Sequence, residues 1–243
     1  MINNPVREYL KLINMVHSYI DIEKQLLNEY PLVNGLNDYR KCKQQNKQTT
    51  TSNINTEECQ NKMEKIKNKA LVCQRCGLSK TRTQVVFGEG SLNSKLVIVG
   101  EAPGFYEDQK GLPFVGEAGQ LLTKMLQAIG LKRKDVYICN VIKCRPPKNR
   151  NPEPNEIAAC SQWLEFQLKI MQPEIICAMG RFASCVLTGI DQEMWKYRNN
   201  IYNYQGIVLI CTYHPAYLLR SPEQKRKSWQ DLLKIQTFLK KNR

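Results

Sequence analysis

Apolar positions recur at helical spacing at the start of the chain and then give way to a polar stretch. Val6 and Leu10 begin a series with an apolar residue every third or fourth position. This series predicts an amphipathic helix that packs on a larger domain or docks on a partner. Residues 43–56 are almost entirely polar, so burial cannot offset the entropy that they would lose on ordering. The pattern predicts an N-terminal helical extension over residues 1–42 and a flexible linker over residues 43–56.

Short apolar runs alternate with helical patterns after residue 71. The runs predict four strands, at Leu96–Val99, Val136–Ile142, Glu174–Met179 and Ile207–Thr212. Helices are expected between and after them, at about Ala118–Ile129, Asn155–Met171, Phe182–Leu187 and Pro222–Leu239. Strands that are apolar throughout and separated by helices are typical of a parallel sheet covered on both faces. We therefore expect an α/β domain over residues 57–243, with three α/β/α layers and a central four-stranded parallel sheet.

Polar residues are concentrated directly after these strands. Right-handed crossovers bring the carboxyl ends of parallel strands to one edge, where open α/β sheets bind ligands. That edge collects the Glu101 carboxylate, the Asn140 amide, the His214 imidazole and the Phe114 ring. Each residue alone is equally consistent with a role in fixing its own loop, but together they suit a planar polar ligand.

Charge narrows the choice of partner. The 243 residues contain 36 Lys and Arg against 22 Asp and Glu, a net charge of +14, and residues 71–243 account for 25 and 14 of these. An anionic partner is therefore expected, with contacts made by the domain rather than by the extension. The sequence shows neither a secretory signal nor a long uncharged apolar run, so we expect a cytoplasmic protein with no membrane partner. A monomer is the default expectation.

Four of the ten cysteines are candidates for a metal centre. Cys73, Cys76, Cys144 and Cys160 lie beside Lys, Arg, Gly or Pro, whereas most of the others lie in apolar or helical segments. A redox pair would normally follow a strand, but the closely spaced pair here precedes the sheet. Four thiolates fit either Zn²⁺ or a [4Fe–4S] cluster, and spacing alone favours zinc slightly. Either metal would join two separate loops, which indicates a structural role.

Several short motifs occur in an order that resembles a known family, the iron–sulfur uracil-DNA glycosylases of family four. The resemblance covers the chain from about Glu57 to the end. The motifs that carry it are Gly100–Gly104 with Glu107 and Asp108, Gly111–Gly116, Asn140, Cys144–Pro147 with Asn149 and Arg150, and His214–Arg220.

This resemblance implies a specific activity and cofactor. The family hydrolyses the N-glycosidic bond of deoxyuridine in single- or double-stranded DNA, which leaves free uracil and an abasic site. It also implies that the four cysteines hold a [4Fe–4S] cluster, in place of the zinc that spacing favours. The remaining alternative is a catalytically silent nucleic-acid-binding protein with a four-cysteine metal site.

The resemblance also assigns roles at the uracil. Phe114 would stack on the ring, and Asn140 would read its polar edge through two hydrogen bonds. The backbone N–H of Ala102 would bond a uracil oxygen, and Glu107 would crowd the C5 side, where a thymine methyl would clash. His214 would donate to uracil O2, which gains negative charge as the bond breaks.

The remaining roles concern water and DNA. Glu101 would position the attacking water, because other uracil-DNA glycosylases carry an Asp where this chain has Ala102. No histidine lies between Asn140 and Cys160, so we expect turnover rather than covalent capture of the base. Leu218 and Leu219 would fill the space left by the extruded base. The candidate phosphate contacts are Arg220, Arg181, Lys143, Arg145 and Lys148.

Overall fold

The computed structural model describes residues 52–241 of the 243-residue chain. The predicted helix over 1–42 lies outside the described residues, as does most of the predicted linker. Helix α4 (Ser52–Leu71) begins inside that linker, so the polar composition does not prevent its last residues from becoming helical. The domain boundary at residue 57 otherwise stays a prediction.

The centre of the molecule is a six-stranded sheet. Its strands are β1 (Glu89–Gly90), β2 (Leu96–Gly100), β3 (Tyr137–Asn140), β4 (Ile175–Met179), β5 (Ile201–Tyr204) and β6 (Ile207–Thr212). They lie in the order β1-β3-β2-β4-β6-β5. The four inner strands are parallel, which confirms the predicted sheet, while β1 and β5 add an antiparallel strand at each edge.

The two edge strands were not predicted because their sequences lack a buried apolar run. Strand β1 consists of two exposed residues, and β5 alternates between exposed and half-buried positions. The inner strands β2, β3 and β4 are buried along their whole length, which explains their continuous apolar sequences.

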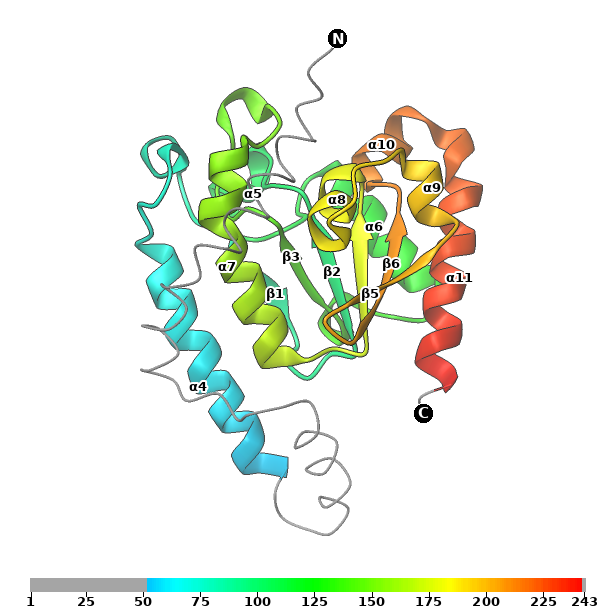
Figure 1. Ribbon diagram of the computed structural model, residues 1–243, viewed down its shortest axis with the longest axis horizontal. Coiled ribbons are helices and arrows are strands. Elements are labelled where there is room, and N and C mark those ends of the chain that lie inside the picture. The colour runs from blue at the N-terminus through cyan, green and yellow to red at the C-terminus, as the bar shows by residue number, and fades with distance from the viewer. Residues whose placement is uncertain (1–51, 242–243) are drawn as a thin grey trace.

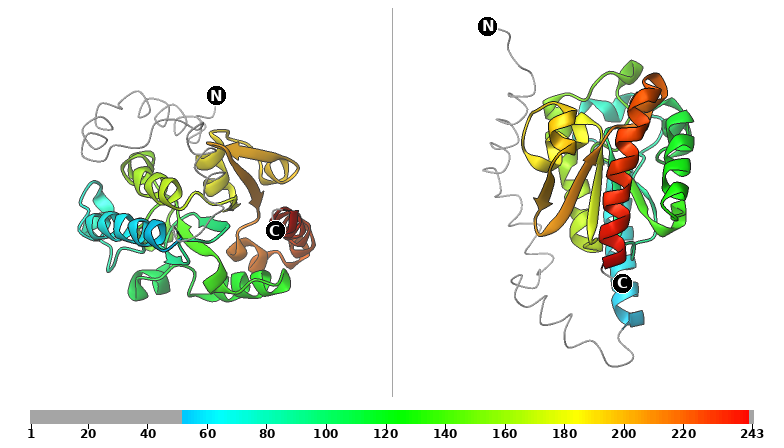
Figure 2. Two further views of the ribbon diagram at one scale, coloured as in Figure 1. Left: turned by 90° about the horizontal axis from the view of Figure 1, so that it is seen from below. Right: turned by 90° about the vertical axis from the view of Figure 1, so that its right-hand side faces the viewer.

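Helices cover both faces of the sheet, which confirms the three-layer α/β/α class (Figure 2). On β2, Val97 and Val99 belong to one core and Leu96 to the other, because successive side chains point to opposite faces. The first core is shared with α4, α7 (Pro154–Met171), α8 (Arg181–Thr188) and α9 (Met194–Arg198). The second is shared with α6 (Glu117–Ala128), α10 (Pro215–Arg220) and α11 (Lys225–Lys241).

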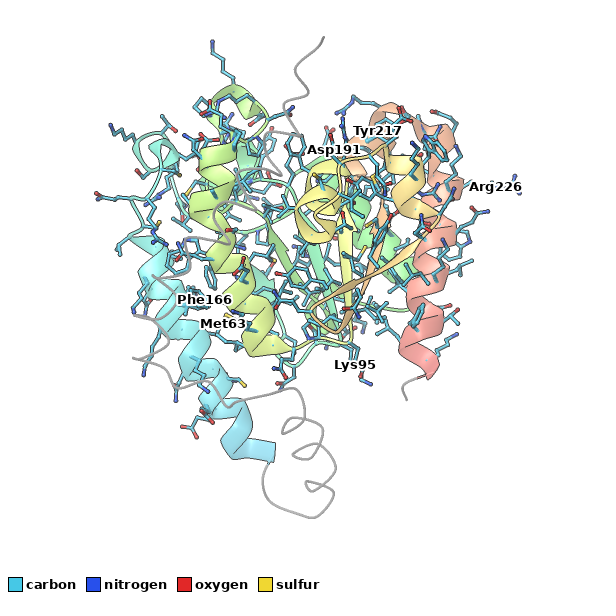
Figure 3. All side chains as sticks on the ribbon, in the orientation of Figure 1. Met63, Lys95, Phe166, Asp191, Tyr217 and Arg226 are labelled. Carbon is cyan, nitrogen blue, oxygen red and sulfur yellow. The ribbon has the colours of Figure 1, made fainter. Side chains whose placement is uncertain are left out.

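Short helices gather at the carboxyl end of the parallel strands. Helices α5 (Phe105–Lys110), α8 and α10 all lie at this end of the sheet in Figure 1. In Figure 3, Tyr217 of α10 lies at the same end, whereas Lys95, which precedes β2, lies at the opposite end. Helices α5 and α10 were not predicted because six residues are too few for a helical period to be recognised. Among the described helices, none is long and apolar enough to cross a membrane.

Candidate active site and cysteine cavity

The last residue of β2, Gly100, makes room for two predicted site residues. A Cβ at this position would lie 2.6 Å from Cζ of Phe114 and closer still to Oδ1 of Asn140. Real Cβ atoms do not approach other atoms so closely, so any larger residue here would displace the Phe114 ring and the Asn140 amide. Asn140 ends β3, which pairs with β2 so that Asn140 is opposite Gly100. The fold therefore brings the amide and the phenyl ring together, as the sequence predicted.

The Asn140 side chain is buried with an unsatisfied acceptor. Its residue exposure is 2%, and Oδ1 has no hydrogen-bond partner. An unpaired buried polar atom costs about 1–3 kcal/mol, so such atoms are rare in folded proteins. An acceptor kept in this state is suited to a ligand that donates a hydrogen bond.

His214 joins this group from the loop after β6. Its ring lies 5.5 Å from that of Phe114, centroid to centroid, with the planes inclined by 28°. His214 is also the N-cap of α10, and its Nδ1 accepts a hydrogen bond from the Ala216 N–H at 3.1 Å. Because Nδ1 accepts, the proton of the neutral ring is on Nε2, which can donate to a ligand.

The environment of His214 keeps the ring neutral. Burial, aided by the nearby Arg220 and opposed by Glu107, lowers its pKa to about 4. At neutral pH the imidazole is therefore an uncharged hydrogen-bond donor rather than a cation.

The loop that carries Phe114 is strained and held from one side by Glu107. Phe114 has a φ of 52°, in the left-handed region that residues with a Cβ rarely adopt. Glu107 Oε1 accepts hydrogen bonds from the N–H groups of Val115, at 2.8 Å, and Gly116, at 2.9 Å. Glu107 therefore fixes the position of the ring, whatever further contact it makes with a ligand.

Arg133 holds the same loop from the other side. Its guanidinium donates to the carbonyl oxygens of Pro113, at 2.9 Å, and Phe114, at 3.2 Å. It also forms an ion pair with Glu89 at 3.0 Å. Arg133 was missed by sequence reasoning because it lies in a short polar turn before β3 and carries no signal of its long-range contacts.

Glu101 follows β2 directly and is partly buried. Burial raises the pKa of its carboxyl group to about 7, so both protonation states are populated near neutral pH. Within the part of the chain that the structure describes, no acceptor is paired with the N–H of the next residue, Ala102. A carboxylate and a free backbone donor therefore both lie in the segment that directly follows Gly100.

The four candidate cysteines line one cavity. Cys73 and Cys76 follow α4, Cys144 lies in the loop after β3, and Cys160 lies in α7. Residues 52–241 contain no group of three His, Cys, Asp or Glu side chains close enough to hold a single metal ion. The fold thus brings the four thiols around a common space.

Two donors point at the sulfur atoms of this cavity. Arg82 Nη1 lies 3.3 Å from Cys144 Sγ, and the Lys143 backbone N–H lies 3.3 Å from Cys160 Sγ. Donors of this kind stabilise negative charge on thiolates. Arg82 was also missed by sequence reasoning, because it lies outside the segments chosen for their spacing.

The predicted surface roles of Lys143 and Leu218 are wrong. Each is only 1% exposed. Lys143 Nζ donates to the Asn140 carbonyl oxygen at 2.8 Å and to Gln167 Oε1 at 2.6 Å, so it supports the Asn140 backbone from inside the core. Leu218 packs in the second core against the sheet. Neither side chain can reach a phosphate or a gap between bases.

The other residues predicted to contact DNA are exposed or partly exposed. Leu219 is 40% exposed and Arg220 follows it at the end of α10. Lys148 is exposed, and Arg145 is half-buried. Arg181 is half exposed but pairs with Asp191 at 2.8 Å, which restricts its reach.

Comparison with known proteins places this arrangement in a family. The model of the uracil DNA glycosylase superfamily matches residues 87–233. A type-4 uracil-DNA glycosylase of Thermotoga maritima is 46% identical over 183 residues, which are 74% of this chain and 95% of that protein. A type-4 uracil-DNA glycosylase of Archaeoglobus fulgidus is 41% identical over 181 residues, or 71% of this chain and 91% of that protein.

A more distant relative helps to place the chain within the superfamily. A type-5 uracil-DNA glycosylase of Pyrobaculum aerophilum is 32% identical over 145 residues, or 52% of this chain and 63% of that protein. Identity and coverage are both higher for the type-4 proteins. The resemblance seen in the motifs is confirmed, and the chain belongs to the uracil DNA glycosylase superfamily, among its type-4 members.

Proposed function

We propose that this chain hydrolyses the N-glycosidic bond of deoxyuridine in DNA, releasing uracil and leaving an abasic site for base excision repair. The observation that supports this most directly is the buried Asn140 amide, whose unpaired acceptor lies beside the Phe114 ring. A silent nucleic-acid-binding protein would gain nothing from such an acceptor, and the family does not favour that alternative.

Asn140 distinguishes uracil from cytosine by its donor and acceptor pattern. Oδ1 would accept from uracil N3–H, and Nδ2 would donate to uracil O4. Cytosine has an acceptor at N3 and a donor at N4, so the same amide orientation would meet it with both signs reversed. Phe114 would stack on the ring, and Glu107, on the loop that it clamps, would lie near C5 and exclude a thymine methyl.

His214 and Glu101 would act on the bond that breaks. As the bond lengthens, negative charge develops on uracil O2 and positive charge on the sugar. The Nε2–H of neutral His214 would donate to O2, and such a donor is worth about 2.7–4 kcal/mol in the transition state. The Glu101 carboxylate would orient water toward the sugar carbon, and the Ala102 N–H would bond a uracil oxygen.

The target base must leave the helical stack before it can enter this site, at a cost of a few kcal/mol. Leu219 is the exposed apolar side chain suited to fill the vacated space. The cationic residues that would hold the flanking phosphates are Arg220, Arg145, Lys148 and Arg181. We propose that the protein acts as a monomer and turns over, without covalent capture of uracil.

We propose that the cysteine cavity holds a [4Fe–4S] cluster rather than zinc. A single zinc ion needs its thiolates within about 2.3 Å of one point, whereas a cluster binds each thiolate at a separate iron. The resemblance to the iron–sulfur family, the placement of all four cysteines around one cavity, and the donors from Arg82 and the Lys143 backbone support the cluster. Once bound, it would join the end of α4 to the loop after Asn140.

The function is tested on oligonucleotides that carry U, T or C at one position. Purified protein should form abasic sites at U alone, which alkaline cleavage reveals as strand breaks. Failure to cleave at U by cluster-loaded protein would refute the proposal. Cleavage at T as well would contradict the role of Glu107.

The cofactor is tested separately by spectroscopy and metal analysis. A cluster gives a brown protein that absorbs near ~400 nm and contains about four irons. A colourless protein with one tightly bound zinc would show that the slight preference from spacing was correct.

A further inference from the structure

Two neighbouring aromatic side chains are exposed in the first turn of α5. Phe105 and Tyr106 are 50% and 59% exposed, and their rings meet edge to face with centroids 5.5 Å apart. Large aromatic side chains normally gain stability from burial, and adjacent exposed rings are typical of binding surfaces. Neither residue was predicted as a site residue, and neither is used in the mechanism above.

Tyr106 borders the loop that positions Phe114. A Cβ on Gly116 would lie 3.4 Å from Tyr106 Cδ2 and 3.5 Å from Glu107 Oε1. The Tyr106 ring therefore lies against the segment that Glu107 clamps. Because this segment follows Phe114 directly, the ring lies beside the loop that would hold the base.

Phe105 borders the loop that follows Asn140. The Arg145 guanidinium lies over the Phe105 ring, 5.1 Å from its centroid, and Arg145 Nε donates to Asn149 Oδ1 at 2.7 Å. The cation is thus held on the ring by a second contact. Helix α5 and this loop both lie at the carboxyl end of the sheet (Figure 1).

We propose that Phe105 and Tyr106 form a second base site, on which a nucleobase adjacent to the extruded uracil stacks. This inference rests on the proposed function, since it places the substrate strand across the rim of the uracil pocket. Aromatic rings beside a cation are the usual means of binding single strands, because every base offers a π face and every nucleotide a phosphate. Arg145 supplies that charge, and the domain as a whole is basic.

The site favours a particular form of DNA. In a duplex, the neighbours of uracil are paired and stacked within the helix, so their faces are covered. In a single strand, the neighbouring base can turn onto the rings without breaking pairs. The pair of rings therefore gives the protein a preference for single-stranded or locally opened DNA.

The test removes the rings from the protein and the neighbouring base from the substrate. The double variant Phe105→Leu/Tyr106→Leu keeps apolar side chains but loses both π faces. Single-stranded oligonucleotides carry uracil with either a normal base or an abasic analogue at the 5′ or the 3′ neighbour. For wild type, we expect KM to rise roughly 5- to 150-fold when one of the two neighbours is abasic. With the intact oligonucleotide, the double variant should have the same raised KM that wild type has with the abasic oligonucleotide. Its KM should not rise further when the neighbouring base is removed.

Matched controls separate stacking from general damage. Tyr106→Phe in the Phe105→Leu background restores one ring compared with the double variant, and should restore part of the dependence on the neighbouring base. Ile201→Ala on β5 removes a side chain of similar exposure, 52%, and should leave KM unchanged. Thermal unfolding of each variant reports whether the fold is kept.

The outcomes are distinguishable. If wild type releases no uracil, the proposed function fails. If wild type releases uracil but the double variant has the wild-type KM, the second base site is refuted. It is also refuted if removal of the neighbouring base raises the KM of the double variant by the same factor as that of wild type. If ring removal changes the sedimentation of the protein but not its affinity for DNA, the rings are a contact between copies of the chain, which also refutes the site.

Discussion

The rings of Phe114 and His214 are stacked, with centroids 5.5 Å apart, although one follows α5 and the other follows β6. This contact joins the two loops that would hold the base and stabilise its departure. It also helps to bury the imidazole, which lowers its pKa. The residue proposed to bind the base and the residue proposed to stabilise the leaving group therefore form one packed unit.

Replacement of His214 should reduce turnover strongly. His214→Ala loses the Nε2–H donor, and we expect kcat to fall about 10²- to 10³-fold. His214 also caps α10, so His214→Asp, which keeps a capping acceptor but has no donor when ionised, is the matched variant. Single-turnover kinetics should give a large loss for both variants, with the melting temperature preserved best in His214→Asp. Full activity in His214→Asp would contradict the donor role.

Replacement of Asn140 by Asp should alter base selectivity. A carboxylate cannot donate to uracil O4, so we expect kcat/KM on uracil to fall about 10- to 100-fold. The ratio of activity on U to activity on C should also fall, since Asp can accept from cytosine N4. Excision assays on both oligonucleotides measure this ratio. A selectivity equal to that of wild type would show that another group reads the base.

Arg133 should act on KM through the Phe114 loop. Arg133→Ala removes both hydrogen bonds to the loop carbonyls and should raise KM for uracil-containing DNA several-fold, as the strained backbone relaxes. Glu89→Ala is the control, because it removes the ion pair of Arg133 and leaves the loop contacts. Steady-state kinetics should show a higher KM for Arg133→Ala than for Glu89→Ala. An equal KM for both variants would show that the ion pair, and not the hydrogen bonds to the loop, determines the effect.

Glu101 should make both activity and stability depend on pH. Burial raises its pKa from 4.5 to about 7, so the carboxylate that we propose positions water forms as the pH rises through 7. The rate should increase over that range, and Glu101→Gln should abolish the increase. His214, with a pKa near 4, stays neutral throughout.

The same shift predicts the sign of a stability difference. Between pH 4.5 and 7 the folded protein keeps the Glu101 proton that the unfolded chain has lost, so this group lowers stability as the pH rises. Glu101→Gln should therefore melt above wild type at pH 8, with no such gain below pH 4.5. A constant difference across this range would contradict the raised pKa.

Replacement of Lys143 should affect protein stability, whereas replacement of Lys148 should affect DNA binding. Lys143→Met leaves the Asn140 carbonyl and Gln167 without their buried donor, and should lower the free energy of unfolding by about 1–3 kcal/mol. Exposed Lys148→Ala should leave stability unchanged and reduce the slope of log K against log salt by about 1. Urea unfolding and DNA titrations at several salt concentrations test both. A reduced salt slope for Lys143→Met would contradict its burial.

The parallel sheet and the residues at its edge could be predicted from the sequence. Inner strands buried on both faces must be apolar throughout, and chain direction then places Glu101, Asn140 and His214 at the same end. The antiparallel edge strands could not be predicted, because β1 is too short and β5 too polar to give a distinct signal.

The sequence by itself determined which chemical groups this protein has and at which end of the sheet they lie. Only the tertiary structure decided which way the side chains face: Lys143 and Leu218 inward, Leu219 outward, and Arg133 across to a loop far from it in the sequence. The reason is that strand formation follows from local apolar runs. Burial and long-range hydrogen bonds depend instead on how separate segments pack, and this packing cannot be deduced from the sequence of any one segment.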